Sequence, residues 1–418
     1  MITRLSDHIP SGSTDAGAGF VSAVAVSDPW DTILIDVQTA DFSSLGQYLL
    51  TKPIHLFGEG RPIIDGGAAK GSSIIFADGL AGMRWRDFSA VRFKRFITQE
   101  TVSSAYADLR FSDLSVSDCS EAGIHLSAGC DRVRVDGCHV FDISSTEEAY
   151  GLLIGGKQAH IDNPDFGDNW ISDTVISDIA GEGTEVHGVM IRGKNPVLRN
   201  GAIRQISGTT SGREGAYIWG RGSRVENVAF HNAGEDAFLT IKNTGEDERR
   251  LVSGCSFSGT APTANAIDCF ASDIDIRDNT FDSLEAHTLI SNASPAASIR
   301  CVGNAGANVK ARRLAYARAG GFRWQDNDFS LSDAGNTVFE GVLIQGGGVD
   351  IDDVSIVRNK LYFNADFATS PAFAYRVLQN NVSIRDLVVA DNETASAGGP
   401  VVTFNASGDG ERENWKVS

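Results

Sequence analysis

The chain has 418 residues, and with 45 glycines, 3 methionines and a formal net charge of −18 it is rich in turn formers and strongly acidic. Such a charge argues against general binding to nucleic acid or to an anionic membrane. No apolar segment approaches the roughly 20 residues needed to span a bilayer, and residues 1–8 lack the apolar core of a signal peptide.

Residues 1–30 are expected to cap one end of the fold, because an open strand edge needs cover. The first strands follow as short apolar runs that end near glycine or aspartate, at residues 33–35, 54–58 and 63–66. Runs of this length between turn-forming residues are typical of strands, and few segments could form a long helix.

From Trp85 onward a six-residue motif recurs: an apolar residue, any residue, Asp, Asn or Gly, two further residues, and a second apolar residue. Its turn position falls at residues 87, 113, 137, 173, 200, 227, 254, 278, 326, 359 and 386. These positions are mostly 24 to 27 residues apart, and a degenerate copy near Asn304 fills the largest gap. A period in the mid-twenties with two strands per unit predicts one coil of a parallel β-helix, whereas a propeller needs a longer period.

The expected fold class is therefore all-β, a single-stranded right-handed parallel β-helix whose core grows lengthwise. Residues 31–402 would form a solenoid of about 12 coils. Insertions interrupt the period near residues 157–170 and 308–321 and are expected to project from one side. Residues 403–418 are expected to form a C-terminal tail that covers the other end.

A second strand series aligns without gaps from Gly151, Gly188 and Gly215, and more loosely from Asp236. Alternation directs the second and fourth residues inward and the third, fifth and seventh outward. The predicted outer columns are Leu153/Met190/Tyr217/Phe238, Gly155/Arg192/Trp219/Thr240 and Lys157/Lys194/Arg221/Lys242. Like charges about 4.8 Å apart repel one another, and a bound anionic chain would offset that cost. Solvated cations that cover a sheet edge or pair with carboxylates are the alternative.

Titratable residues stand directly before these strands. The place before the first strand position holds Tyr150, His187, Glu214 and Glu235, with Glu185 and Asp236 close by. Carboxylates one coil apart would lie roughly 5 Å from each other, near the separation that retaining glycosidases use. The alternative for each one is a turn carboxylate that accepts backbone N–H bonds or pairs with the basic column.

Cysteines and metal-ligating residues point to no cofactor requirement. The cysteines form no CxxC pair and are predicted to be buried free thiols: Cys119, Cys130, Cys138, Cys255, Cys269 and Cys301. Hard oxygens that suit Ca²⁺ come from Asp162, Asn163, Asp165 and Asp168. Their spacing matches no EF-hand, so a solvated acidic loop is the preferred interpretation.

With this repeat, the chain resembles the pectate-lyase-like superfamily of right-handed β-helix proteins over most of its length, at the level of the fold. The resemblance implies a glycan bound along the outside of one long sheet. The segment Gly234–Lys242 is similar to the paired-aspartate segment of polygalacturonase-type hydrolases and to the lysine strand of chondroitinase-B-like and alginate lyases. The GHG and RIK motifs of the former are not present, nor is the Arg-His-Gly segment of the latter.

The basic column favours an anionic, uronate-containing polysaccharide or oligosaccharide that is cleaved by β-elimination. The sugar carboxylate would be neutralised by cations such as Arg192, Lys194, Arg221 or Lys242. The predicted substrate-binding residues are Lys157, Arg192, Lys194, Trp219 and Arg221. Proton transfer would use Tyr217, His187 or Lys242. A glycoside hydrolase would instead use Glu214, Glu235 and Asp236.

Two further alternatives are a phage tailspike depolymerase and a non-catalytic glycan-binding β-helix. The protein is expected to be extracellular or virion-associated and either a monomer or a homotrimer. Neither nucleic acid nor a membrane is expected as a partner.

Overall fold

The computed structural model describes residues 1–156, 166–209, 212–242, 248–292, 298–335, 338–346, 348–369 and 371–418. These residues form a parallel-strand β-solenoid of about 14 turns with 4% helix, which confirms the all-β class and slightly exceeds the predicted coil count. The chain divides into two compact units, unit 1 at Met1–Gly220 and unit 2 at Arg221–Ser418. In the part of the chain described, no helix has the length and apolarity needed to cross a membrane.

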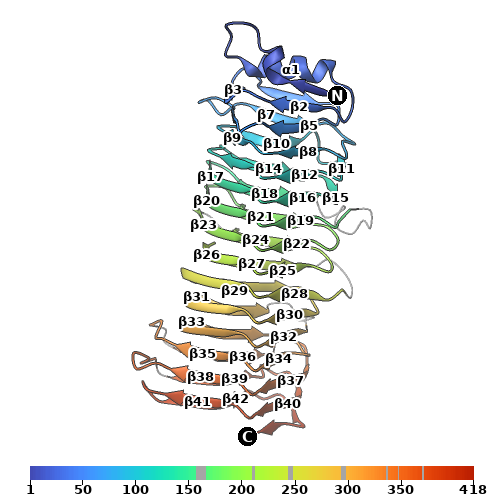
Figure 1. The fold of residues 1–418 in the computed structure, drawn as a ribbon. Helices are drawn as coiled ribbons and strands as arrows, with labels where there is room; N and C mark the ends of the chain where they lie inside the picture. The colour runs from blue at the N-terminus through green and yellow to red at the C-terminus, as the bar shows by residue number, and fades with distance from the viewer. Residues whose placement is uncertain are drawn as a thin grey trace. The chain divides into compact units, whose positions relative to one another are not determined.

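Each coil contributes up to three strands, which we assign to rows A, B and C in chain order (Figure 1). Row A of unit 1 consists of β1 (Ile2–Arg4), β2 (Thr32–Ile35), β5 (His55–Gly58), β8 (Arg84–Arg86), β12 (Arg110–Ser112), β16 (Arg134–Asp136), β19 (Trp170–Ser172) and β22 (Val197–Arg199). Row B consists of β3 (Thr39–Asp41), β6 (Ile63–Asp65), β9 (Ser89–Val91), β13 (Ser115–Ser117), β17 (His139–Ser145), β20 (Val175–Gly181) and β23 (Ala202–Gly208). Row C consists of β4 (Gln47–Leu50), β7 (Ser73–Phe76), β10 (Arg95–Gln99), β14 (Ala122–Leu126), β18 (Ala149–Ile154), β21 (Val186–Arg192) and β24 (Arg213–Trp219).

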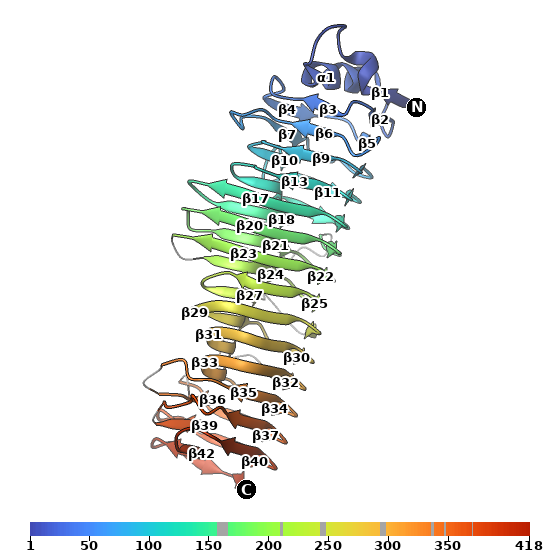
Figure 2. The ribbon, with the colours of Figure 1, turned by 60° about the vertical axis from the view of Figure 1, so that its left-hand side comes forward.

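Unit 2 repeats this plan with longer strands. Its row A consists of β25 (Arg224–Glu226), β28 (Arg250–Ser253), β30 (Ile274–Arg277), β32 (Ile299–Val302), β34 (Arg323–Gln325), β37 (Ile351–Val357), β40 (Ile384–Ala390), β43 (Arg412–Glu413) and β44 (Lys416–Val417). Three strands run through both row B and row C (Figure 2), namely β29 (Ser256–Phe270), β31 (Thr280–Asn292) and β33 (Ala305–Ala317). The remaining strands are β26 (Ala229–Ala233), β35 (Asp328–Leu331), β38 (Lys360–Phe363) and β41 (Glu393–Ser396) in row B, and β27 (Ala237–Lys242), β36 (Gly341–Gln345), β39 (Ala372–Leu378) and β42 (Val401–Ser407) in row C.

Parallel pairing in register builds the core from the apolar positions of the repeat. In unit 2 the rings of Phe230, Phe257 and Phe281 stack with centroids 4.9 and 5.0 Å apart. This distance is close to the spacing of neighbouring strands, so the last apolar place of the motif forms an internal ladder. Each such side chain is withdrawn from water, which stabilises the coil by about 1.5–3 kcal/mol per large residue.

The N-terminal segment of unit 1 holds the helices, η1 (Leu5–His8) and α1 (Ala16–Val26). The carboxylate of Asp15 accepts a hydrogen bond from the backbone N–H of Ala18 and so caps α1. Phe20 of α1 lies 5.3 Å from the ring of Phe42 in the first coil. The helix therefore packs on the first coil (Figure 1).

The bend from row A to row B uses a left-handed residue, as the motif predicted. Positive φ occurs at Asp87, Asp113, Gly137, Asp173, Asn200, Asn227, Gly254, Asp278 and Asp326, and Gly303 fills the gap predicted near Asn304. One predicted turn position is wrong by the same criterion, because at the coil assigned to Asn359 the left-handed residue is Arg358. Asp386 is left-handed as predicted, but it lies inside β40, and a second left-handed residue, Asp391, follows the end of that strand.

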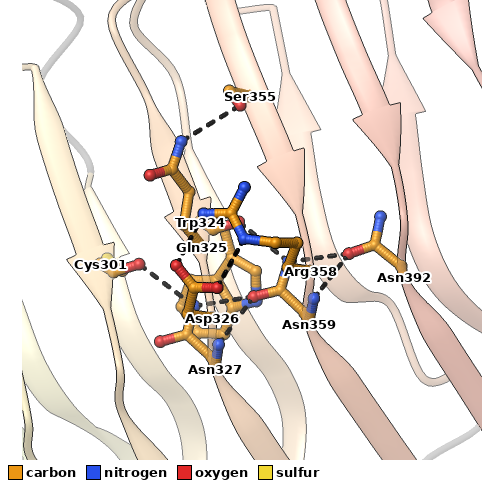
Figure 3. A network of polar contacts seen from close by, with 9 residues as sticks. All are labelled: Cys301, Trp324, Gln325, Asp326, Asn327, Ser355, Arg358, Asn359 and Asn392. Atoms are coloured by element: carbon orange, nitrogen blue, oxygen red, sulfur yellow. Dashed lines mark hydrogen bonds and ion pairs between the residues drawn. The ribbon is translucent and has the colours of Figure 1, made fainter.

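At the bends of unit 2 from Asp278 onward, the residue after the left-handed one is an asparagine, which is buried in every case except the half-buried Asn392. Figure 3 shows part of this ladder, which runs through Asn279, Asn304, Asn327, Asn359 and Asn392. Each amide Nδ2 donates to the Oδ1 of the next asparagine at 2.9 to 3.0 Å. Each Nδ2 also donates to a backbone carbonyl, for instance from Asn327 to Cys301 at 3.1 Å. The ladder thereby satisfies buried polar groups that would otherwise be costly.

Two segments bear on the expected insertions. Residues 157–165 of the first lie outside the described residues. Most of the second, residues 308–321, belongs to β33, which pairs with β31 and β36. The C-terminal residues also pair in parallel, with β42 on β39 and β43 and β44 on β40. The short strands β11 (Ala105–Ala107) and β15 (Gly129–Asp131) form a separate pair.

All six cysteines are free and buried, as predicted. Burial raises the pKa of the Cys119 and Cys138 thiols to about 12. Both side chains therefore stay protonated at neutral pH and act as small apolar residues.

Candidate functional site

Strands β18, β21 and β24 lie side by side in row C of unit 1 (Figures 1 and 2), and their register forms two columns of residues. One column is Tyr150, His187 and Glu214, and the other is Leu153, Met190 and Tyr217. The parallel register pairs them as the sequence alignment predicted. Residues from three coils are therefore neighbours on one face.

Glycines between the columns set the direction of these side chains. A Cβ on Gly151 would lie 2.5 Å from the carbonyl oxygen of Gly188, and one on Gly188 would lie 2.6 Å from that of Gly215. Strict alternation would place Tyr150 and Leu153 on opposite faces. The two side chains nevertheless belong to one cluster, so the glycine column breaks the alternation.

The outer columns are less exposed than the alternation predicted. Leu153 and Met190 are only 3% and 1% exposed, so their assignment as exposed residues was wrong. They are covered because they cluster with Ala122 and Tyr150, against which Tyr217 packs. The outer face of row C therefore has a small apolar core of its own.

Aromatic rings form a stack along this face. His125 of β14 lies 5.3 Å from Tyr150, Tyr150 lies 5.8 Å from His187, and His187 lies 5.5 Å from Tyr217, measured between ring centroids. His125 and His187 are 9% and 2% exposed. Two imidazoles and two phenols thus share one partly desolvated surface.

Carboxylates flank the buried imidazole of His187. Its Nδ1 lies 3.1 Å from Oε2 of Glu214, without the alignment of a hydrogen bond, and its Nε2 lies 4.0 Å from Oε2 of Glu185. The Tyr150 hydroxyl is 2.7 Å from the same Glu185 oxygen and 3.0 Å from Glu148. Because a phenol has one proton to donate, the two glutamates compete for it. The result is a row of neighbouring titratable groups from Glu148 to Glu214.

Burial and these charges shift the titration of the ring residues. Burial, together with the hydrogen bond to Glu185, raises the pKa of Tyr150. Burial and the charge of Glu214 raise the pKa of Tyr217. Burial, assisted by the charges of Arg95 and Arg192, lowers the pKa of His125 to about 3. Both phenols are therefore protonated at neutral pH, and His125 is neutral.

Arg192 and Trp219 are paired in register beside this cluster and are half-buried. The Arg192 guanidinium lies 5.3 Å from the Trp219 ring centroid, and that ring lies 6.0 Å from the ring of Tyr217. A cation held over an aromatic face is partly desolvated and directional. The arrangement offers a cation and an aromatic surface next to the protonatable groups.

The other predicted site residues lie after β21, outside the described residues, or in unit 2. Lys194 is half-buried and its backbone bridges to Gly167. Lys157 lies outside the described residues. Unit 2 holds Arg221, Glu235, Asp236 and Lys242, all half-buried, with Lys242 paired to Phe270.

Three participants were not among the predicted site residues: His125, Tyr150 and Glu185. Tyr150 and Glu185 stood at the correct places in the alignment without being assigned a role. His125 was missed because the aligned series began one coil too late. The run Gly123-Ile124-His125-Leu126 has the same glycine-led pattern and would have extended it.

Most of the acidic loop considered for Ca²⁺ falls outside the described residues. Asp162, Asn163 and Asp165 lie outside the described residues. Asp168 accepts a hydrogen bond from Asn195 at 3.0 Å. Within the residues described, no group of three or more His, Cys, Asp or Glu side chains is placed to hold a metal ion.

These features define a parallel β-helix protein with a buried, protonatable cluster on one row of strands. No family model matches the chain, and no curated protein matches it. Solved structures similar to it are pectate-lyase-like parallel β-helix proteins, the class that the repeat resembles. The likeness is one of fold.

One such structure is the ORF18 protein of Geobacillus virus E2, at 12% identity and a TM-score of 0.46, over 80% of this chain and 62% of that one. The chain thus spans less than two thirds of that protein's length. Another is the family 28 exopolygalacturonase of Yersinia enterocolitica, at 12% identity and 0.44, over 100% and 78%. A third is the A-module of the mannuronan C-5 epimerase AlgE4 of Azotobacter vinelandii, at 14% identity and 0.44, over 100% of both chains.

Proposed function

We propose that the outer face of row C in unit 1 binds a uronate-containing glycan and cleaves it by β-elimination. The observation that carries the proposal is the burial of His187 between two carboxylates on a sheet face that would otherwise contact water. Burying titratable groups is costly unless they are paired, and paired groups of this kind are typical of proton-transfer sites.

Each step of elimination has a candidate group. Arg192 neutralises the sugar carboxylate, which makes the proton on the adjacent C5 more acidic. Glu214, backed by His187, removes that proton, and the electron pair forms the C4–C5 double bond as the C4–O bond breaks. Tyr217 is protonated at neutral pH, so it can give its proton to the departing oxygen. Exchange with solvent then restores both groups.

Hydrolysis is the second candidate, because Glu185 and Glu214 both flank His187. The side chain of Glu185 is 44% exposed and that of Glu214 is 14% exposed. One carboxylate would protonate the leaving oxygen, and the other would activate water or attack the sugar. This route needs no cation, so Arg192 would affect binding alone.

Product analysis tests the proposal. The full chain is incubated with alginate, pectate and glycosaminoglycans, while ultraviolet absorbance of the unsaturated product and new reducing ends are followed together. We expect absorbance to rise on at least one polyuronate, and Tyr217→Phe to abolish it while the exposed Tyr362→Phe has no effect. Reducing ends without absorbance would replace elimination by hydrolysis. Binding without any product would leave a glycan-binding protein.

A further inference from the structure

Unit 2 contains a different charged cluster on row C, centred on a buried carboxylate. Glu340 directly precedes β36 and its side chain is 5% exposed. Its Oε2 lies 2.6 Å from Nη2 and 2.8 Å from Nε of Arg313, and 3.2 Å from Nη2 of Arg312. Its Oε1 accepts a hydrogen bond from Nη1 of Arg376 at 2.8 Å. One carboxylate thus holds three guanidinium groups.

The charges of this cluster do not balance. Three arginines against one glutamate leave a net charge of +2 on a chain whose formal net charge is −18. In the described part of unit 2, no second carboxylate lies within ion-pair distance of Arg312, Arg313 or Arg376. Neighbouring like charges repel more strongly as they are desolvated, so this surplus is unfavourable without a further anion.

Hydrogen-bond donors are also in surplus. A guanidinium has five N–H donors, and a carboxylate accepts about four bonds in total, so Glu340 cannot use most of the donors of three arginines. Nε of Arg376 is buried and has no partner among the described residues. The side chains of Arg312 and Arg376 are 39% and 22% exposed. Both therefore have donors within reach of a ligand.

Rigid neighbours fix the positions of these donors. The Arg313 guanidinium lies 5.2 Å from the ring centroid of Tyr316, and that of Arg376 lies 4.7 Å from the ring centroid of Phe373. The arginines come from β33 and β39, which both pair with β36 in row C (Figure 1). Holding long side chains in place lowers the entropy cost of binding. The cluster has the properties of a preorganised anion site.

We infer that Arg312, Arg313 and Arg376, held by Glu340, form a second binding site that takes a carboxylate-bearing saccharide. Planar guanidinium groups bind carboxylates through paired hydrogen bonds. The anionic nature of the ligand follows from the surplus charge. Its saccharide nature rests on the function proposed for unit 1, because a chain that cleaves a polyuronate meets further carboxylates along the same polymer.

Calorimetric titration of the full chain with trimers of galacturonate, mannuronate and guluronate tests this inference. The Arg192→Gln variant lacks the cation of the unit 1 site, so any trimer that this variant still binds reports on the site in unit 2. We expect Arg312→Gln in this background to weaken that binding at least 10-fold, and added salt to weaken it as well. Arg358→Gln, an exposed arginine paired with Asp326, is the matched control and should change it less than 2-fold.

The outcomes separate this inference from the function proposed for unit 1. If Arg192→Gln alone abolishes binding, or if a neutral trimer such as cellotriose binds equally well, the second site is refuted and the first can still stand. If Arg192→Gln binds normally and Arg312→Gln does not, the second site stands and the substrate role of unit 1 fails. Arg312 is more exposed than Arg376, so its substitution should disturb folding less. Arg312→Gln therefore decides the test even if an Arg376→Gln variant does not fold.

Discussion

The outer face of row C carries opposite charge arrangements in the two units. In unit 1 carboxylates surround the imidazole of His187, and in unit 2 guanidinium groups surround the carboxylate of Glu340. In each unit the backbone of row C is a row of parallel strands. Outward positions of a solenoid contribute little to its core, so they can be specialised coil by coil for proton transfer or for binding an anion.

The bends between rows A and B show a second difference. In unit 1 the residue after the left-handed position varies, with Phe88, Leu114, Cys138 and Thr174 in successive coils. In unit 2 the same place holds Val228 and Cys255 at the first two bends and the asparagine ladder from Asn279 onward (Figure 3). The backbone geometry therefore does not require asparagine. Apolar packing and a closed hydrogen-bond network are alternative ways to fill the bend.

The largest effect is expected for a carboxylate of unit 1. Glu214→Gln keeps the shape of the side chain and removes its basicity, so we expect kcat to fall by about 100-fold or more, as for other acid–base groups. Initial rates of product formation measure it. Glu182→Gln, an exposed glutamate of unit 1, should keep the rate of the unaltered protein. Equal loss in both variants would mean that Glu214 acts on the fold and not on the reaction.

The glycine column of unit 1 should be the next most sensitive feature. In Gly188→Ala the new Cβ would lie 2.6 Å from the carbonyl oxygen of Gly215, and we expect a loss of about 1–3 kcal/mol in the free energy of unfolding, as for other overpacked sites. Urea unfolding measures it. A Cβ at Gly71 meets no atom within 4 Å, so Gly71→Ala is the matched control and should not destabilise. A stable Gly188→Ala protein would show that the strands can separate here.

The fold could be predicted because its information is periodic. Asp87, Asp113 and Asp173 each mark a bend in the sequence, and the coordinates place each in the left-handed region. The turn position was misassigned where two adjacent residues of a bend could both match the motif. Asn359 matched the motif, yet it is the ladder residue and Arg358 is the left-handed one. A residue type that is tolerated at two adjacent places cannot fix the register by itself.

The site could be predicted only in part, because it depends on burial. The columns containing His187, Glu214 and Tyr217 followed from counting residues. Alternation could not show that Met190 is covered, since Tyr217 and Tyr150 pack beside it from other coils. The cluster around Glu340 was missed for a similar reason. Arg313 lies 27 positions before Glu340 and Arg376 lies 36 positions after it, so these groups meet only through the fold.

The ladder offers a test of the two kinds of bend. Asn327→Ala removes an amide that donates to Cys301 and Asn359 and accepts from Asn304, so buried partners are left unsatisfied. We expect a loss of about 1–3 kcal/mol in the free energy of unfolding. Thr174→Ala at the equivalent bend of unit 1 should cost about 1 kcal/mol, because its hydroxyl bonds fewer groups. Equal losses in urea unfolding would contradict the distinction between the bends.

The smallest expected effect concerns pH and His125. Its pKa is lowered to about 3 by burial and by nearby arginines, whereas in the unfolded chain it would be near 6.5. The unfolded chain therefore binds a proton that the folded chain does not between these two values, so stability falls as the pH is lowered through this window. Between pH 7.5 and 5.5 the share of His125 is about 1 kcal/mol. His125→Phe keeps a ring in the stack and removes the titration, so its urea unfolding should lose less stability over this range than the unaltered protein does. Leu153→Met, a volume-conserving change on the next coil, is the control and should keep the full pH dependence of stability. If His125→Phe keeps the full pH dependence as well, the proton uptake on unfolding belongs to another group, and the ring stack of unit 1 does not determine the loss of stability in acid.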